Sequence, residues 1–205
     1  MKKNLYLLIM LLIVPGILSA KFKTTHHTNI RPITATKFEV TDINHEHPKI
    51  VDLSGKNFIL VSVREPGSDG EVYAVDSDGT IWWHGRISSG APGHETHNGI
   101  FHVLLKRRFH MSSKYPDPRG IDNMDFELQF TPDGQALHLG NNRAYSHGCI
   151  HVPRQDISAV FKWAEVGTTV VVMRGHYRQF LTEEVDEFTR DVAEYDRMMG
   201  ISGDY

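Results

Sequence analysis

Cysteine is nearly absent from this sequence of 205 residues, which contains only Cys149. A single cysteine leaves no partner for a disulfide within the chain, so the small disulfide-rich folds of secreted proteins are excluded. Positive charge is not in excess either, because the formal net charge is −3. Nothing therefore indicates a nucleic-acid partner. After residue 20 there is also no apolar run long enough to predict a membrane span.

The exception to this lack of apolar runs is the N-terminus. Two lysines are followed by an apolar stretch from Leu5 to Val14 and by the small residues Ser19 and Ala20. The stretch is well short of the roughly 20 residues that span a bilayer and is typical of a secretory signal peptide. We expect residues 1–20 to be a signal peptide and the protein to be exported to the periplasm or cell envelope. If uncleaved, this segment is the only expected contact with a membrane.

Composition divides the remaining chain into three parts. Residues 21–48 are polar, rich in His and Thr and poor in core residues, which predicts an arm or linker. Residues 49–174 contain short β-branched runs separated by turn signals, which predicts a mostly β domain, a sandwich or barrel. The expected strands are "KIVDL", "FILVSV", "EVYAV", "TIWWHGRI", "GIFHVLLKR", "FELQF", "QALHLG" and "TTVVVM".

Two segments have helical rather than strand periodicity. Apolar residues in "RQDISAVFKWAEV", directly after the cysteine, recur at helical spacing. Residues 175–205 predict a C-terminal helical extension, with Thr182 as N-cap and Gly200 at its end. The apolar stripe of that helix is formed by Val185, Phe188, Val192, Tyr195 and Met199.

The lone cysteine lies in "AYSHGCIHVP", after Gly148 and two residues from both His147 and His151. Three interpretations stay open. Cys149 is a buried small residue, a metal ligand, or a nucleophile. If the stretch is extended, positions 147, 149 and 151 share one face and would suit Zn or Cu. A nucleophile needs a base, and His138 in "ALHLG" is a candidate beside the two flanking histidines. We favour the nucleophile.

The motif "SHGCIHVP" closely resembles the signature of the L,D-transpeptidase catalytic domain (YkuD-like) family. Three upstream segments resemble other motifs of this family in the same order. They are "ISSGAPGHETHNGIFHVLLK", "MSSKYP" and "GQALHLG". The resemblance covers roughly residues 49–173, and several linked motifs are far more specific than one tetrapeptide. It implies a YkuD-like β-sandwich with a few short helices, to which the C-terminal helix is added.

The resemblance implies a cysteine acyltransferase that acts on peptidoglycan stem peptides and needs no cofactor. Cys149 would form a thioester with the stem as the terminal D-amino acid leaves. The acyl group would then pass to an amine of a second stem, of a lipoprotein lysine or of a free D-amino acid. With water as acceptor, the enzyme would be an L,D-carboxypeptidase. A catalytically inactive metal-binding or wall-binding module is the other alternative.

The resemblance also assigns roles to single residues. Cys149 matches the nucleophile and His138 the general base, whose imidazole the family orients through a backbone carbonyl, here that of Leu139. His147 and Gly148 match the loop that shapes the oxyanion hole with the Cys149 amide. The residues expected to bind substrate or shape its cleft are Tyr115, Ser146 and His151. His151 stands where Arg or Asn is usual and His97 where proline is usual, so we expect altered substrate contacts.

Overall fold

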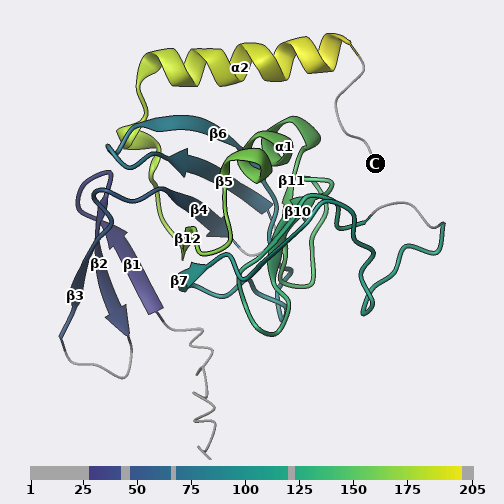
Figure 1. The fold of residues 1–205 in the computed structure, drawn as a ribbon, viewed down its shortest axis with the longest axis horizontal. Helices are drawn as coiled ribbons and strands as arrows, with labels where there is room; N and C mark the ends of the chain where they lie inside the picture. Colours follow the sequence, from purple (N-terminus) through teal and green to yellow (C-terminus); the bar gives the residue numbers. More distant parts are fainter. Residues whose placement is uncertain (1–27, 43–46, 66–67, 120–122, 200–205) are drawn as a thin grey trace, which may run out of the picture.

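The computed structural model describes residues 28–42, 47–65, 68–119 and 123–199. These residues form three β-sheets, two α-helices and one short 3-10 helix (Figure 1). The mostly β fold with a C-terminal α-helix is confirmed. The predicted signal peptide at 1–20 and Gly200 lie outside the described residues.

The largest sheet has five strands in the order β6-β5-β4-β12-β7. β12 is parallel to β4, and the other neighbours are antiparallel. β-branched residues dominate its central strands, as expected for strands buried on both faces. The bounds are β4 Phe58–Glu65, β5 Ser68–Val75, β6 Ile81–Ile87, β7 Gly99–His102 and β12 Thr169–Met173.

A second sheet of four strands carries the cysteine loop, in the order β11-β10-β9-β8. β10 and β11 are parallel, whereas β8, β9 and β10 are antiparallel. The predicted strand "GIFHVLLKR" is divided between β7 and β8, which lie in different sheets. Between them Val103 N–H bonds to Thr168 O and Leu104 N–H to Gln129 O. The bounds are β8 Leu105–Arg107, β9 Glu127–Gln129, β10 Ala136–Leu139 and β11 Ile150–Val152.

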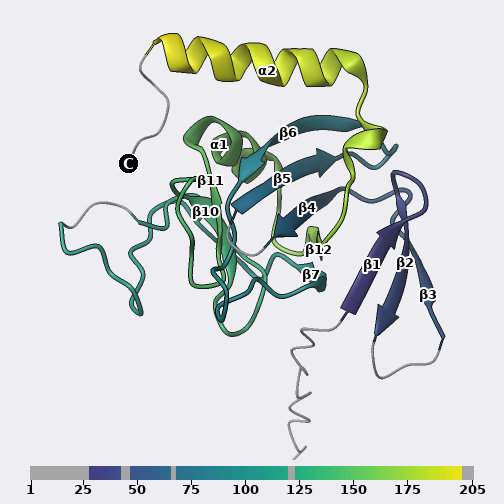
Figure 2. The ribbon, with the colours of Figure 1, turned by 180° about the vertical axis from the view of Figure 1, so that it is seen from behind.

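The five-stranded sheet is apolar on both faces, and each face packs against a different sheet. Along β4, Ile59, Val61 and Val63 point into the core shared with the four-stranded sheet and α1. Phe58 and Leu60 point the other way, because successive side chains of a strand alternate between faces. Figure 2 shows the four-stranded sheet and α1 on one side and β1–β3 on the other.

The second face, which contains Phe58 and Leu60, is covered by residues for which the sequence predicted a polar arm or linker at 21–48. That prediction is wrong for residues 28–42. Residues 28–42 contain β1 Thr28–Pro32 and β2 Lys37–Asp42, which form an antiparallel sheet with β3 Lys49–Asp52. Ile30 and Phe38 are 2% and 0% exposed and pack with Tyr73 and Tyr177. A few apolar residues at alternating positions suffice here, because the five-stranded sheet supplies most of the apolar surface of this core.

The two α-helices contact β6 of the five-stranded sheet, and α1 also contacts β10 of the four-stranded sheet. α1 Arg154–Trp163 follows β11 directly and confirms the predicted helix. η1 Arg178–Phe180 precedes α2 Glu183–Met198, where Thr182 Oγ1 accepts the Val185 N–H at 3.4 Å as the predicted N-cap. α2 lies over β6 (Figure 1), with the rings of Phe188 and Trp83 5.9 Å apart. Within the described residues no helix is long and apolar enough to cross a membrane.

Candidate active site

Cys149 lies at the end of the loop that leads into β11. In the parallel pair β10–β11, His138 is the register partner of His151, and their rings contact edge to face with centroids 5.1 Å apart. Two residues before this pair on both strands, the same register places Cys149 beside Ala136. The backbone amide of Ala136 interacts with the sulfur. Cys149, directly before β11, and His138, in the adjacent strand β10, therefore lie on one face, as the nucleophile interpretation requires.

His138 is buried, with 4% of its surface exposed. Its Nδ1 lies 2.8 Å from the carbonyl oxygen of Leu139, the residue expected to orient it. The pKa of His138 is lowered to about 3, mainly by burial and to a smaller extent by the neighbouring His151 and His110, although the Leu139 carbonyl opposes them. His138 is accordingly a neutral imidazole near pH 7. Because an imidazole nitrogen next to a carbonyl must carry the proton, Nε2 keeps the free lone pair.

The thiol of Cys149 is partly buried and donates a weak hydrogen bond to Gly134 O at 3.8 Å. Burial is the main reason that its pKa is raised to about 11. The Ala136 amide opposes this rise, whereas the carboxylates of Glu127 and Asp133 add to it. The resting site thus contains a neutral thiol beside a neutral imidazole.

Internal hydrogen bonds hold the loop before Cys149. Ser146 Oγ accepts the Gly148 N–H at 3.0 Å and donates to Cys149 O at 2.5 Å. Gly148 has a φ of +109°, and a Cβ there would meet Gln135 Nε2 at 2.6 Å. Glycine is therefore required both by the backbone conformation and by the close packing of Gln135. Since the Gly148 N–H already has a partner, it is not a free donor.

Two residues that the sequence analysis did not single out support this loop. Thr96 Oγ1 donates to Gly148 O at 2.9 Å and accepts the Gly90 N–H at 3.1 Å. Gln135 Oε1 accepts the His97 N–H at 2.9 Å, so position 97 contributes its backbone to the wall of the site. The motif segments contain both residues, but no local pattern distinguishes a loop-supporting Thr or Gln from any other.

The residues expected to bind substrate differ in accessibility. Tyr115 is 42% exposed and stacks on the exposed ring of His147, with centroids 4.1 Å apart. Ser146 is 5% exposed, and its hydroxyl is occupied within the loop. His151 Nδ1 lies 3.2 Å from the carbonyl oxygens of both Asn141 and Ala144. Tyr115 and His147 are thus open to a ligand, whereas Ser146 and His151 hold the loop.

The arrangement required by the metal interpretation is not present. The loop is bent at Gly148, so His147 stacks on Tyr115 while His151 turns toward residues 141–144. Among the described residues no group of three or more His, Cys, Asp or Glu side chains could hold a metal ion.

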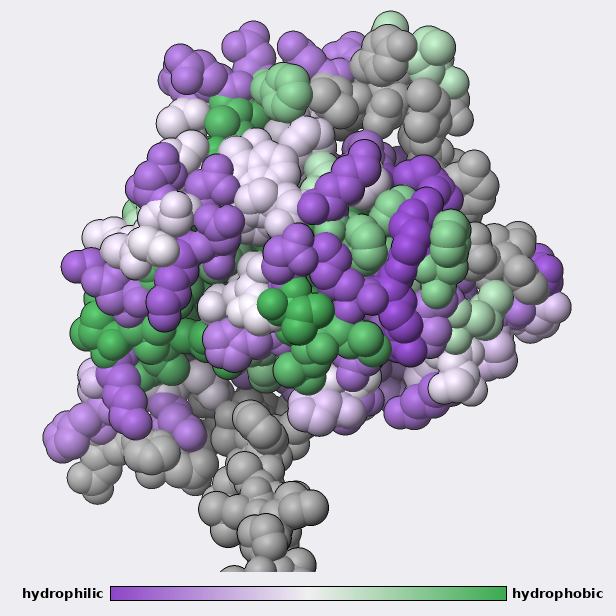
Figure 3. Space-filling model, in the orientation of Figure 1, coloured by the Kyte–Doolittle hydropathy of each residue, from purple (hydrophilic) through white to green (hydrophobic). Residues whose placement is uncertain are grey.

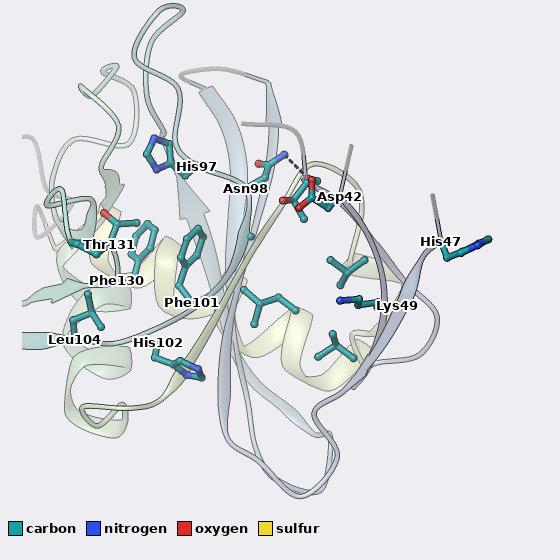
Figure 4. A pocket seen from close by; sticks show the side chains of 16 residues that line it. Asp42, His47, Lys49, His97, Asn98, Phe101, His102, Leu104, Phe130 and Thr131 are labelled. Carbon is teal, nitrogen blue, oxygen red and sulfur yellow. Dashed lines mark hydrogen bonds between the residues drawn. The ribbon is translucent and has the colours of Figure 1, made fainter. Parts of the chain in front are cut away.

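A separate cavity of about 490 Å³ lies between the N-terminal sheet and β7 (Figure 4). Phe101 and Phe130 form its apolar wall, and Lys49 points into it from β3. Figure 3 shows hydrophobic surface over β1–β3 and in the region of β7. Neither Cys149 nor His138 lines this cavity, so it is distinct from the cysteine site.

Comparison with known proteins identifies the family of the chain. The model of the L,D-transpeptidase catalytic domain (YkuD) family matches residues 56–172, which include β4 to β12 and the cysteine loop. This match covers more than half of the chain. No curated protein matches the chain.

Solved structures of L,D-transpeptidases resemble the chain at low identity. The enzyme from Stackebrandtia nassauensis is 22% identical with a TM-score of 0.48, covering 59% of this chain and 58% of that one. An Enterococcus faecium L,D-transpeptidase is 20% identical with a TM-score of 0.48, and the match covers 62% of this chain and 56% of that enzyme. L,D-transpeptidase 1 of Mycobacterium tuberculosis is 20% identical with a TM-score of 0.45, and the match covers 69% of this chain and 73% of that enzyme.

The chain therefore spans less than two thirds of the first two of these structures. TM-scores below 0.5 are too low for such likenesses to bear on activity or substrate. The family is shown by the match over residues 56–172, which contains the motifs and the site described above. This chain belongs to the L,D-transpeptidase catalytic domain (YkuD) family.

Proposed function

We propose that this chain is a cysteine-dependent L,D-transpeptidase that acts on peptidoglycan stem peptides, with Cys149 as nucleophile and His138 as general base. The observation that carries the proposal is the placement of Cys149 directly before β11, beside the parallel strand β10 that contains His138, with His138 Nδ1 fixed on Leu139 O. Membership of the L,D-transpeptidase family supports the reaction class.

The protonation states argue against a preformed thiolate. Since the pKa of Cys149 is raised and that of His138 lowered, both are neutral before substrate binds. As the sulfur attacks the stem carbonyl, its proton passes to His138 Nε2. When the C–N bond breaks, the imidazolium returns the proton to the departing amine of the terminal D-amino acid, leaving a thioester on Cys149.

The oxyanion of the tetrahedral intermediate needs a donor that is not already occupied. The Gly148 N–H is bonded to Ser146 Oγ, whereas the Cys149 N–H makes no hydrogen bond with the described part of the chain. We assign the Cys149 N–H as an oxyanion donor. Gly148 and Ser146 then act by fixing the direction of this N–H, and His147 by contributing to the rim with Tyr115.

Tyr115 and His147 are the proposed contacts for the stem peptide, since both are exposed and stacked beside the cysteine loop. A stacked aromatic pair offers a flat apolar surface with polar edges, which suits a peptide backbone. We further propose that the protein acts outside the cytoplasm, in the cell envelope where the stems are found.

Purified protein incubated with tetrapeptide-stem muropeptides tests the proposal. We expect loss of the terminal D-amino acid with formation of a 3–3 crosslink or an exchanged D-amino acid, detected by mass spectrometry. Bare tripeptides alone would instead identify an L,D-carboxypeptidase. Cys149→Ala should abolish every product, and retained activity in this variant would exclude Cys149 as nucleophile.

A carbapenem gives an independent assay of the same thiol. Its strained carbonyl should acylate Cys149 and add the mass of the intact drug, because the chain has no other cysteine. An absence of any adduct in the wild type, under conditions that label a known L,D-transpeptidase, would contradict an open and reactive site.

A further inference from the structure

A buried carboxylate, not used in the mechanism above, lies in the sheet that carries the site. Glu127 on β9 is 1% exposed. Arg107 on β8 clamps it from the side, with Nε 2.5 Å from Oε2 and Nη2 2.9 Å from Oε1. His110 Nδ1 lies 2.8 Å from the same Oε2. The guanidinium of Arg107 matches the charge of this buried carboxylate.

The strand register brings Glu127 beside the proposed base. Leu128 of β9 pairs with Leu137 of β10, and Glu127 and His138 are the residues next to this pair on the two strands. Arg107 pairs with Glu127 on the other side. A row of side chains thus crosses the sheet from Arg107 through Glu127 and His138 to His151.

Two electrostatic relationships agree with this placement. Glu127 is close enough to Cys149 to raise the pKa of its thiol, and His110 is close enough to His138 to lower the pKa of that imidazole. His110 contacts Glu127 directly. The carboxylate, the two imidazoles and the thiol therefore occupy one region of the structure.

We infer that Glu127, clamped by Arg107, is a positioning carboxylate for the Cys149–His138 pair, and that its negative charge stabilises the imidazolium formed when His138 takes the thiol proton. This inference rests on the function proposed above. The proton moves from sulfur to His138 Nε2 and then to the leaving amine. Glu127 takes no part in this proton transfer, and its effect is electrostatic.

Other charged groups near the pair do not replace Glu127. Asp133 also raises the pKa of Cys149, but its effect is smaller and its side chain is 51% exposed, where water screens it. Asp125 is buried and bonded to Arg108. The groups that face the site from the surrounding elements are Arg107, Arg108, His110, Lys114, Asp125, Asp133 and His151.

The first experiment measures the ionisation of the single thiol without any substrate. Alkylation of Cys149 by iodoacetamide is followed by mass spectrometry as a function of pH. In Glu127→Gln the midpoint should move to lower pH, because a negative charge near the thiol is gone. In Arg107→Gln it should move to higher pH, because the same carboxylate loses its counter-charge.

These opposite shifts separate an electrostatic role from a structural one. General damage to the site would expose the thiol and move both midpoints in the same direction. Glu39→Gln is the matched control, since it breaks an exposed Arg31–Glu39 pair on the N-terminal sheet and should leave the midpoint unchanged. If Glu127→Gln does not fold, Arg107→Gln and Arg107→Lys decide, and the lysine variant should give the smaller upward shift.

The second experiment measures the acylation rate of Cys149 by a carbapenem. Acylation of the Glu127→Gln variant should be about tenfold slower, which corresponds to the loss of one pKa unit of imidazolium stabilisation. This decrease is expected even though the thiol of the variant ionises more easily. The acid limb of its rate profile should move to lower pH, since His138 becomes a weaker base. Glu127→Asp should retain most of the rate because it keeps the charge.

Unchanged or same-direction midpoints in the Glu127 and Arg107 variants would overturn the inference, as would a Glu127→Gln acylation rate equal to that of the wild type. The failure of the proposed function would look different. In that case the wild type itself would form no acyl-enzyme, while the alkylation midpoints would still show whether Glu127 acts on the thiol.

Discussion

The rings of His138 and His151 meet edge to face across two parallel strands, with centroids 5.1 Å apart. The two imidazoles have different surroundings. Nδ1 of His138 is turned to the carbonyl of its own neighbour, Leu139, whereas Nδ1 of His151 is turned to carbonyls of the loop after β10. His151 therefore ties that loop to β11, whereas His138, held on the carbonyl of its own strand neighbour, is the proposed base.

The buried His138 and the exposed His147 should differ in the effect of removing the ring. His138→Ala should lower the rate of acylation by a carbapenem by about 10²–10⁴-fold, the contribution typical of a positioned general base. His147→Ala, which removes an exposed ring, should change it far less. The rates are measured from the mass of the acyl-enzyme over time. A loss of only about twofold in His138→Ala would move the base to His147 or His151.

A second prediction concerns the glycine that bends the cysteine loop. Gly148→Ala should cost about 1–3 kcal/mol of backbone strain and also displace Gln135, so activity should fall sharply. Gly55 is the matched control, because its φ is +80° but nothing lies within 4 Å of an added Cβ. Gly55→Ala should therefore be destabilised by strain alone and keep its acylation rate. Equal activity of the two variants would contradict this account of the loop.

Stability should depend on pH through the buried histidine. The pKa of His138 is about 3 in the folded state, below its ordinary value of 6.5. Between these values the unfolded chain binds a proton that the folded chain does not, so the free energy of unfolding falls as the pH is lowered. The slope contributed by His138 is at most about 1.4 kcal/mol per pH unit.

Urea unfolding at a series of pH values between 7 and 4 measures this slope. His138→Gln should show a shallower loss of stability toward acid than the wild type. His151 and His84, whose pKa values burial also lowers, contribute to the remaining slope. The exposed His102 at the end of β7 is the control site. Identical slopes in the wild type and His138→Gln would show that His138 is not buried as a neutral group.

The N-terminal sheet should be an integral part of the fold. Phe38 is fully buried and contacts the rings of Phe58 and Tyr177, at centroid distances of 5.9 and 6.3 Å. Phe38→Ala should lower the free energy of unfolding by about 3–5 kcal/mol. Ile33→Ala, at a position 48% exposed between β1 and β2, should have a small effect. A loss below about 1 kcal/mol for Phe38→Ala would contradict the role of this sheet as a cover.

Local pattern was sufficient for much of the fold. β-branched runs identified most of the strands, because alternating apolar side chains and turn residues are properties of adjacent positions. The same holds for α1, for the N-cap at Thr182 and for Gly148, whose neighbours reveal a tight loop. The motif around Cys149 and its linked segments identified the family for the same reason, since they are read directly from the order of residues.

What the sequence by itself determined, then, was most of the strands, the two α-helices, the family and the residues expected to react. Only the tertiary structure decided that residues 28–42 form a sheet, because Phe38 is buried by β4 and β12 rather than by its neighbours in sequence. It also decided that Glu127, in a strand of alternating pattern, is buried beside His138 and clamped by Arg107. These outcomes depend on pairings between strands distant along the chain, which composition and periodicity do not encode locally.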